Sequence, residues 1–174
     1  MIIGVISDSH DNIYALRNVL RSLVEKGVEE IIHLGDIISP FTVKLMYELL
    51  RDSKIPVTAI KGNNDGDIHL LTSLFNKYEW VFKTEPSVIT IENRKLLILH
   101  GFDGADFTDG VSHALATSLD VDAVLYGHTH RPVLKQIDGK LILNPGEVCG
   151  YLTGMITYST LDLSTMKAEI FEYK

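Results

Sequence analysis

The first 60 residues alternate short apolar runs with segments that carry apolar residues at helical spacing. The runs predicted to be strands are Ile2–Ile6, Glu30–Leu34 and Val57–Ile60. The segments predicted to be helices are Asn12–Lys26, which Gly27 ends, and a helix that Ser39 and Pro40 open and that carries Leu45, Met46, Leu49 and Leu50. Neighbouring parallel strands need a crossover connection, usually a helix, and this spacing provides it. The alternation therefore predicts a parallel sheet.

The rest of the chain is richer in strands. One helix is expected after Asp67, to about Asn76, and a weaker one at Phe107–Ser118. The predicted strands are Ser87–Glu92, Lys95–His100, Ala123–Tyr126, Val133–Ile137, Leu141–Leu143, Met155–Leu163 and Met166–Tyr173. Asn93-Arg94 and Asp138-Gly139 are predicted to be hairpin turns. With 174 residues, of which 45% are hydrophobic, the chain can bury one substantial core. We expect a single mixed α/β domain over residues 1–174.

The net charge limits the partners of this domain. Lys and Arg total 16 against 23 Asp and Glu, which gives a formal net charge of −7. A protein that binds polynucleotides usually presents a basic patch to the phosphates, and this sequence has no basic run. We therefore expect no polynucleotide partner, and any phosphate that the protein binds needs local positive charge.

Cysteine content and hydropathy bear on the compartment. The single cysteine, Cys149, cannot form an intramolecular disulfide and fits a reducing compartment. No apolar stretch approaches the roughly 20 residues that a bilayer span needs. The opening run Met1–Ile6 lacks the flanking features of a signal peptide and predicts a buried strand. We expect a soluble, cytoplasmic protein without a membrane partner, and homo-oligomerisation stays open.

Metal-capable side chains follow five of the predicted strands, at the point where each apolar run stops. The stretches are Asp8-Ser9-His10, Gly35-Asp36, Gly62-Asn63-Asn64-Asp65, His100-Gly101 and Gly127-His128-Thr129-His130. In α/β sheets, ligands collect outside the carboxyl ends of the strands. Residues two apart in extended backbone project to the same side, so the Asp and His of the first stretch could reach one centre, as could the two His of the last. Mixed oxygen and nitrogen ligands suit manganese, iron, zinc, nickel or cobalt better than calcium.

Each stretch also fits a structural role. Asp8 can cap a helix, Asp36 can be a loop acid, and His100 can be satisfied at a strand end. The sequence KGNND at 61–65 can be a turn that closes a strand. Two histidines two residues apart after an apolar strand are harder to explain by packing. Five such stretches at successive strand ends favour one shared site.

In their order, these stretches resemble the motifs of the calcineurin-like metallophosphoesterases, which are D-x-H, G-D, G-N-H-E or a variant, H, and G-H-x-H. This sequence has DSH, LGD, GNND, HG and GHTH, and Asn144-Pro145-Gly146 completes the last motif. The resemblance covers nearly the whole chain and is strongest to the small, cap-free archaeal and bacterial phosphodiesterases. It implies a two-sheet β-sandwich flanked by helices, with four αββα layers, around a site for two metals.

The resemblance also implies which side chains hold the metals. One divalent cation would be bound by Asp8, His10, Asp36 and His130. The other would be bound by Asp36, Asn63, His100 and His128, so that Asp36 bridges the two. Manganese is the expected metal, with nickel, cobalt, iron or zinc as alternatives. Two such cations would give an acidic protein a local anion site and lower the pKa of a shared water toward about 7.

Asn64 departs from the family pattern. Many members have a histidine at this position that is thought to assist the leaving group, and an amide cannot deliver a proton at neutral pH. We expect Asn64 to hydrogen-bond the phosphoryl oxygens, although a plain turn residue is the alternative. The prediction is hydrolysis of small or activated phosphodiesters, such as aryl diesters, by a metal-bridging hydroxide, with weak activity on phosphomonoesters.

Two other functions stay open. A subunit of the retromer complex has this fold and serves mainly as an interaction scaffold, and such proteins typically lose a motif histidine. All seven inferred ligands are present here, which favours catalysis. The third candidate is a nuclease, which would need a basic track beyond the metals.

Other polar residues carry weaker signals. His69 could donate a proton to a leaving group and Arg131 could contact one, although both also fit exposed positions. Several residues are expected to have structural roles, namely His33 within a strand, His113 within a predicted helix, Cys149 as a buried thiol, and Asp11 and Asn12 as caps of the first helix.

Overall fold

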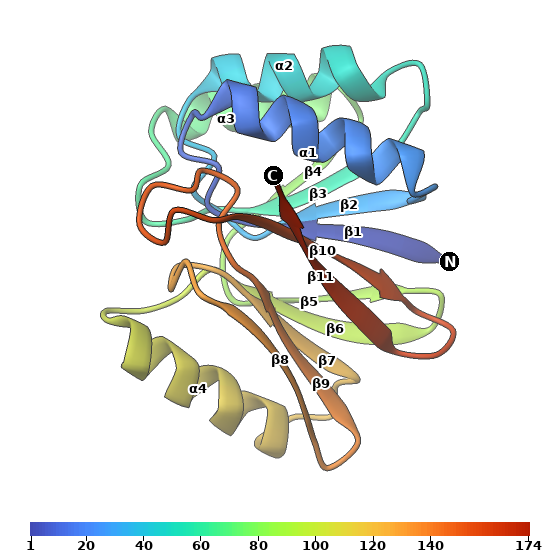
Figure 1. Ribbon diagram of the computed structural model, residues 1–174, viewed down its shortest axis with the longest axis vertical. Helices are drawn as coiled ribbons and strands as arrows, with labels where there is room; N and C mark the ends of the chain where they lie inside the picture. Colours follow the sequence, from blue (N-terminus) through green and yellow to red (C-terminus); the bar gives the residue numbers. More distant parts are fainter.

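Two mixed β-sheets face each other in the computed structural model, which describes residues 1–174, and helices cover the outer face of each sheet (Figure 1). The helices are α1 (Ile13–Glu25), α2 (Pro40–Leu50), α3 (Ile68–Lys77) and α4 (Ala105–Ser118). The strands of the first sheet, in spatial order, are β11 (Lys167–Tyr173), β10 (Ile156–Asp162), β1 (Ile2–Ile6), β2 (Glu30–His33), β3 (Val57–Ile60) and β4 (Val81–Lys83). Those of the second sheet are β5 (Ser87–Ile91), β6 (Arg94–Leu99), β7 (Ala123–Tyr126), β9 (Lys140–Pro145) and β8 (Pro132–Ile137). The predicted two-sheet sandwich flanked by helices is confirmed.

Three apolar cores separate the four layers. The first lies between the first sheet and α1, α2 and α3, and buries Leu20 and Phe75. The second lies between the two sheets and buries Val5 and Leu125. The third is smaller and buries Ala116 of α4 against the second sheet. Full burial of a large apolar side chain contributes about 1.5–3 kcal/mol relative to exposure, so these cores hold the layers together. None of the four helices is long and apolar enough to cross a bilayer.

The side chains of strand β1 pack into two different cores. Ile3 and Val5 point between the sheets, whereas Ile6 belongs to the core under the helices. Side chains alternate across a strand, so Gly4 shares the helical side with Ile6. A Cβ atom at Gly4 would lie 3.0 Å from the Cδ atoms of Leu23, which means that the missing side chain lets α1 approach the sheet.

Parallel pairing places several strand ends at one edge of the sandwich. Strands β1, β2, β3 and β4 pair in parallel in the first sheet, and β6, β7 and β9 pair in parallel in the second. The carboxyl ends of β1 to β3 and of β6 and β7 lie on the left in Figure 1, where α1, α2, α3 and α4 begin. Polar residues that follow these strands therefore face one another across the two sheets.

One predicted turn is displaced by a residue, and one strand was not predicted. The hairpin between β5 and β6 turns at Glu92 and Asn93, which have φ of 49° and 65°, and Ile91 pairs with Arg94. The turn therefore lies one residue before the predicted Asn93-Arg94, because this two-residue turn needs two left-handed residues and Asn tolerates that conformation. Strand β4 was not predicted, since its three residues are too few to show an alternating pattern.

The predicted cap of α1 is half correct. Asn12 accepts a hydrogen bond from Ala15 N at 3.2 Å and caps α1 as predicted. Asp11 serves α2 instead, because its Oδ1 accepts from Ser39 N at 3.1 Å, Ser39 Oγ at 2.9 Å and Thr42 Oγ1 at 2.6 Å. Ser39 occupies the N-cap position of α2, but its hydroxyl donates to Asp11 and makes no cap bond. A carboxylate beside the positive end of a helix dipole is favourable, so Asp11 fastens the start of α2 to the loop after β1.

Candidate metal centre

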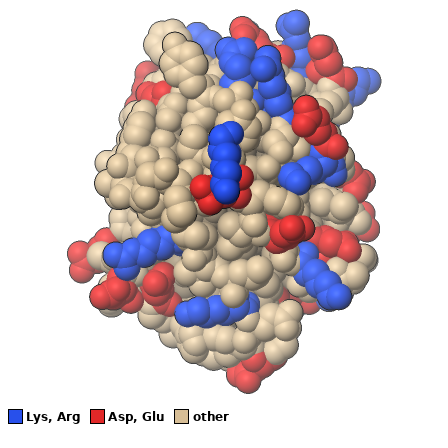
Figure 2. Space-filling view, in the orientation of Figure 1, with Lys and Arg blue, Asp and Glu red and all other residues tan.

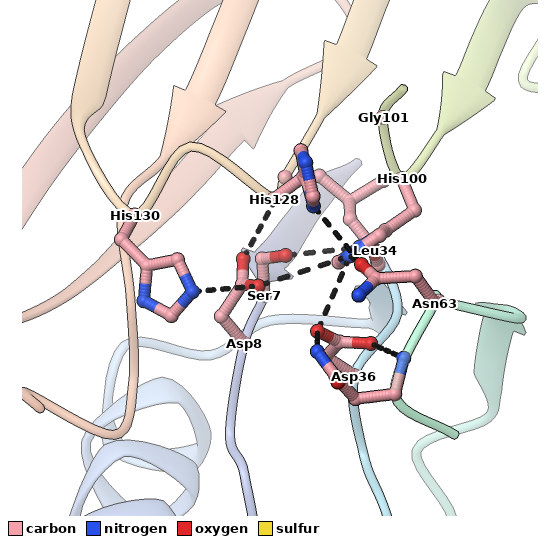
Figure 3. A network of polar contacts seen from close by, with 12 residues as sticks. Ser7, Asp8, Leu34, Asp36, Asn63, His100, Gly101, His128 and His130 are labelled. Carbon is pink, nitrogen blue, oxygen red and sulfur yellow. Dashed lines mark hydrogen bonds and ion pairs between the residues drawn. The ribbon is translucent and has the colours of Figure 1, made fainter. Parts of the chain in front are cut away.

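All seven predicted ligand residues lie together at the edge where the strand ends meet, and Figure 3 labels each of them except His10. The first sheet contributes Asp8 and His10 after β1, Asp36 after β2 and Asn63 after β3. The second sheet contributes His100 after β6, and His128 and His130 after β7. The site thus joins both halves of the sandwich.

Two buried carboxylates stand at the middle of this group. Asp8 Oδ1 lies 3.4 Å from His130 Nε2 and 3.7 Å from His10 Nε2. Asp36 Oδ2 lies 3.3 Å from His10 Nε2 and 3.3 Å from His100 Nε2. Two ligands about 2.1 Å from one cation and roughly 90–110° apart would be about 3.0–3.4 Å from each other. Most of these spacings suit ligands that share a cation, and Asp36 Oδ2 lies between two of the imidazoles.

Asn63 connects the two histidines of the second sheet that lie nearest to it. Its amide oxygen is 2.9 Å from His100 Nε2 and 3.0 Å from His128 Nδ1. The oxygen faces the same space as Asp36 Oδ2 (Figure 3). An amide oxygen in this position is a neutral acceptor, so it adds no negative charge to the centre.

The orientation of three imidazoles is fixed from outside the centre. In each ring the nitrogen that faces away from the centre lies against an oxygen that can only accept a hydrogen bond. The pairs are His100 Nδ1 with Leu34 O at 2.7 Å, His128 Nε2 with Asp103 O at 2.6 Å, and His130 Nδ1 with Glu147 Oε2 at 2.6 Å. A proton on the outward nitrogen satisfies each of these oxygens, and the inward nitrogen can then offer its lone pair to a cation. Such outer partners are typical of histidines that bind metals.

Glu147 is the main residue that the sequence did not reveal. It is fully buried, and besides His130 it accepts hydrogen bonds from Cys149 Sγ at 2.9 Å and from the backbone of the loop after β9. Burial opposes its ionisation, but hydrogen bonds from Cys149, Thr153 and His130 outweigh that effect and lower the pKa of Glu147 to about 2. The carboxylate is therefore charged and saturated with donors.

Cys149 is buried, as predicted. Burial and the hydrogen bond to Glu147 raise the pKa of its thiol to about 12, so the sulfur is protonated and donates. Ligand atoms of His10, His130 and Cys149 do lie within 4.8 Å of one another. A metal needs the thiolate, and the His130 nitrogen nearest to the sulfur, Nδ1, already bonds Glu147. We therefore leave Cys149 out of the centre.

The electrostatics of the centre fit a divalent metal. Asp8 Oδ1 and His10 Nε2 are buried without a hydrogen-bond partner, and such atoms are costly unless something binds them. Burial alone would lower the pKa of His100, but the hydrogen bond to Asp36 and the charges of Asp8 and Asp36 raise it to about 9. The same negative field that holds a proton on an imidazole favours a bound cation. The donor set, two carboxylates with four imidazoles and an amide, suits a transition metal.

The backbone that brings the ligands together is not extended. Five of the seven residues have left-handed φ, namely Asp8 (52°), His10 (42°), Asp36 (56°), His128 (66°) and His130 (59°). The side-by-side projection expected from extended strands was therefore the wrong reason for their convergence. Residues other than glycine adopt this conformation at a cost, and such strain gathers at functional sites.

Two glycines make this packing possible. A Cβ atom at Gly127 would collide with Ser7 Oγ and lie 3.0 Å from Asp8 Oδ2. A Cβ atom at Gly62 would collide with the carboxylate of Asp36. Both collisions involve groups within the centre or next to it, so glycine is required for the close approach of the strands.

Asn64 and Asp65 hold the loop after β3 against Asp36. Asn64 donates from its backbone N to Asp36 Oδ1 and from Nδ2 to Asp36 Oδ2, both at 2.8 Å. Asp65, a further residue that was not predicted, accepts from the backbone N of Asp36, Ile38 and Gly62. The side chain of Asn64 is thus directed to the carboxylate that the two halves of the site share.

The weaker candidates lie outside this group. His33 is buried, its Nε2 lies 3.0 Å from Ser9 Oγ, and burial lowers its pKa to about 4, which fits its predicted structural role. His113 lies in α4, the helix predicted at this place, and its side chain is exposed. His69 and Arg131 are also exposed, and no side-chain hydrogen bond or ion pair links either one to the centre.

Several known proteins are similar in sequence to this chain. The family model that describes the calcineurin-like phosphoesterase superfamily domain matches residues 1–166 of the sequence. A phosphodiesterase of Methanocaldococcus jannaschii is 34% identical over 169 residues, which cover 93% of each chain. The phosphodiesterase YfcE of Escherichia coli K12 is 26% identical over 152 residues, which cover 82% of this chain and 76% of the relative.

Solved structures that resemble this chain include a phosphodiesterase and a Vps29 protein. A novel archaeal phosphodiesterase superimposes with a TM-score of 0.87 at 33% identity, over 99% of this chain and all of the other. Vps29 of Entamoeba histolytica, solved with zinc, has a TM-score of 0.69 at 24% identity over 99% of this chain and 92% of its own, and shares the fold. The predicted family and fold are confirmed. The chain belongs to the calcineurin-like phosphoesterase superfamily.

Proposed function

We propose that this protein is a metal-dependent phosphodiesterase that acts on small phosphodiesters. Two relatives and one solved structure carry the name phosphodiesterase, which supports a hydrolase of this class. The observation that carries the proposal is the shared position of Asp36 Oδ2, 3.3 Å from an imidazole nitrogen on either side. A carboxylate between two sets of donors suits a site for two cations.

The two sets overlap at that carboxylate. The first cation would be held by Asp8, His10, Asp36 and His130. The second would be held by Asp36, Asn63, His100 and His128. Manganese is our first choice, and nickel, cobalt, iron or zinc would fit the same donors. When bound, such ions supply an activated water and stabilise charge on the phosphoryl oxygens.

Charge balance explains how an acidic chain could hold a phosphate. Asp8 and Asp36 are the only carboxylates among the seven residues, because Asn63 contributes a neutral amide. Two divalent ions facing two carboxylates leave roughly two positive charges for an anion. Lys and Arg are scattered among acidic residues on the face in Figure 2 and form no track, which supports a small ester and not a polynucleotide.

Asn64 would bind the phosphoryl group and not protonate the leaving group. Its side-chain amide has two hydrogens, and one is donated to Asp36 Oδ2. The second is available to a phosphoryl oxygen. Because an amide has no proton to give at neutral pH, esters with good leaving groups should be hydrolysed fastest, and phosphomonoesters slowly.

Metal content and turnover together test the proposal. Protein loaded with Mn²⁺ and desalted should retain about two ions per chain by elemental analysis. It should hydrolyse bis(p-nitrophenyl) phosphate faster than p-nitrophenyl phosphate, and Asp36→Asn should lose both the ions and the activity. Similar rates on the two esters would contradict a diesterase.

A non-catalytic scaffold is the alternative, and the similarity to Vps29 keeps it open. All seven candidate ligand residues are present in this chain, and the buried unpartnered atoms of Asp8 and His10 have no evident use in a scaffold. Absence of both bound metal and diester turnover would favour the scaffold.

A further inference from the structure

Three large side chains are exposed on two segments that hydrogen bonds connect to each other and to His130. Tyr14, in the first turn of α1, is 78% exposed. Tyr151 and Leu152, in the loop between β9 and β10, are 63% and 74% exposed. We call these three residues the apolar lip. Exposed apolar groups that gather next to a candidate site often mark a binding surface.

Hydrogen bonds tie the lip to the metal centre. Glu147 Oε2 accepts from His130 Nδ1 at 2.6 Å and from the backbone N of Tyr151 at 3.1 Å. One carboxylate oxygen thus joins a predicted ligand to the backbone of the lip. Asn12 Nδ2 donates to Cys149 O at 2.8 Å, which ties the start of α1, and with it Tyr14, to the same loop.

The loop that carries the lip is held firmly. Glu147 Oε1 accepts from Leu152 N at 3.1 Å and from both N and Oγ1 of Thr153 at 2.6 Å. The buried carboxylate thus accepts from three consecutive residues of the loop, which fixes the loop backbone. A surface that is already ordered loses little conformational entropy when a ligand binds to it.

The loop between β9 and β10 presents no exposed charged side chain, because residues 148–155 include no Lys, Arg, Asp or Glu and Glu147 is buried. The orange-red loop between β9 and β10 is on the left in Figure 1, and Figure 2 shows no Lys, Arg, Asp or Glu over that part of the face. A second anionic group on a substrate would find no cationic side chain on this loop. An uncharged apolar or aromatic group would bury surface against it.

We propose that the apolar lip binds the ester group that stays on the phosphate during hydrolysis, and that this group is uncharged and apolar or aromatic. This inference rests on the proposed function, because it assigns a subsite to the same centre. The metal centre would hold the single negative charge of a phosphodiester, and the lip would select for its non-reacting half.

Two esters with the same leaving group test the assignment. Bis(p-nitrophenyl) phosphate and methyl p-nitrophenyl phosphate both release p-nitrophenolate, and differ only in the group that remains. The variant Tyr151→Ala/Leu152→Ser should raise KM for the bis-aryl ester about tenfold, leave its kcat nearly unchanged, and leave both constants for the methyl ester unchanged. Leu134→Ser removes an exposed leucine of β8 that is not part of the lip, so it is the matched control and should change neither ester.

An unchanged ratio of kcat/KM between the two esters in the lip variant would overturn the inference. If the Mn²⁺-loaded wild type hydrolyses neither ester, the proposed function fails, and the lip is then tested by binding. Diphenyl phosphate should shift the amide resonances of Tyr151 and Leu152, and dimethyl phosphate should not; no difference between the two also overturns the inference. Self-association that Leu152→Ser weakens, with an unchanged ester ratio, would assign the lip to a second copy of the chain instead.

Discussion

Glu147 Oε2 lies 2.6 Å from His130 Nδ1, and both groups are buried at the end of the second sheet. The carboxylate fixes the imidazole with Nε2 toward Asp8 Oδ1, 3.4 Å away. Each hydrogen bond to a charged group is worth about 1.5–3 kcal/mol, so rotation of the ring would be costly. The orientation of His130 is therefore set from a residue that does not face the centre itself.

Replacing this carboxylate by an amide should weaken metal binding without removing a ligand. In Glu147→Gln, the amide NH₂ would oppose donors that now bond Oε1 or Oε2, and His130 would lose its fixed orientation. Loss of such an outer partner typically costs about 10–100-fold in metal affinity. Calorimetric titration with Mn²⁺ measures the affinity, and ¹⁵N chemical shifts of the imidazole report which nitrogen carries the proton.

A carboxylate in the other sheet is the control. Glu30, at the start of β2, accepts from Thr58 Oγ1 at 3.0 Å and lies at the opposite end of that strand from Asp36. Glu30→Gln should leave the Mn²⁺ affinity and the His130 spectrum unchanged. Equal affinity in the two variants would show that Glu147 does not position His130.

The sequence predicted which residues meet because parallel strands align their carboxyl ends. The run from Ala123 to Tyr126 stops at Gly127, and His128 and His130 follow at the same edge as Asp8 and Asp36. The backbone conformation was not predictable from the same pattern. The left-handed φ angles at these residues leave no mark in the alternation of apolar residues from which the strands were predicted.

The role of Glu147 could not be predicted from the sequence, and the reason is physical. Its donors come from His130 and from residues 149–153, a loop without periodicity, so no spacing rule connects them. Asp65 is a similar case, since its three donors are backbone N–H groups, which any residue could supply. Patterns of side chains predict elements and their edges, whereas polar networks built from loop backbone need coordinates.

A histidine at position 64 should change the response to the leaving group. Asn64→His would place a group that can carry a proton beside Asp36, where the amide now donates to Oδ2. A general acid is typically worth about 10²–10⁴ in rate, and helps poor leaving groups most. We expect the rate on phenyl esters to rise relative to nitrophenyl esters, so that the plot of log kcat/KM against leaving-group pKa becomes less steep.

Asn64→Ala separates proton donation from simple loss of the amide. It removes the bond to Asp36 Oδ2 without adding an acid, and should slow all esters by a similar factor. A slope in Asn64→His that matches that of Asn64→Ala would remove the support for the missing-acid account.

Asp8 is predicted to lower the stability of the metal-free protein and to be needed for metal binding. Its side chain is fully buried, and its Oδ1 has no hydrogen-bond partner. In the presence of EDTA, Asp8→Asn should therefore be at least as stable as the wild type, since one buried charge is removed. Excess Mn²⁺ should stabilise the wild type, by about 2.7 kcal/mol at a free concentration 100 times Kd, and Asp8→Asn much less.

Asp65→Asn provides the contrast. The Asp65 carboxylate accepts backbone hydrogen bonds from Gly62 at 2.7 Å, Ile38 at 2.8 Å and Asp36 at 3.2 Å. An amide cannot accept from all of these donors, so this variant should be destabilised with and without metal. Thermal unfolding of both variants with EDTA and with Mn²⁺ gives four midpoints, and a destabilised Asp8→Asn in EDTA would refute the prediction for Asp8.

Gly127→Ala should damage the centre through packing alone. The added methyl would collide with Ser7 Oγ and lie 3.0 Å from Asp8 Oδ2 and 3.1 Å from Leu34 O, where two backbones approach. Overpacking of this kind costs about 1–3 kcal/mol, and relief of the collision would move Asp8 away from His130. Urea denaturation should show the loss of stability, and Mn²⁺ titration a weaker affinity.

Gly110 offers a matched substitution. It lies within α4, no atom lies within 4 Å of a Cβ placed there, and Ala is the better helix former by about 0.5–1 kcal/mol. Gly110→Ala should therefore raise stability and leave Mn²⁺ affinity unchanged. Ser7→Ala removes the hydroxyl that collides, so the double variant Ser7→Ala/Gly127→Ala should recover part of the lost affinity, and full additivity of the two changes would place the cause elsewhere.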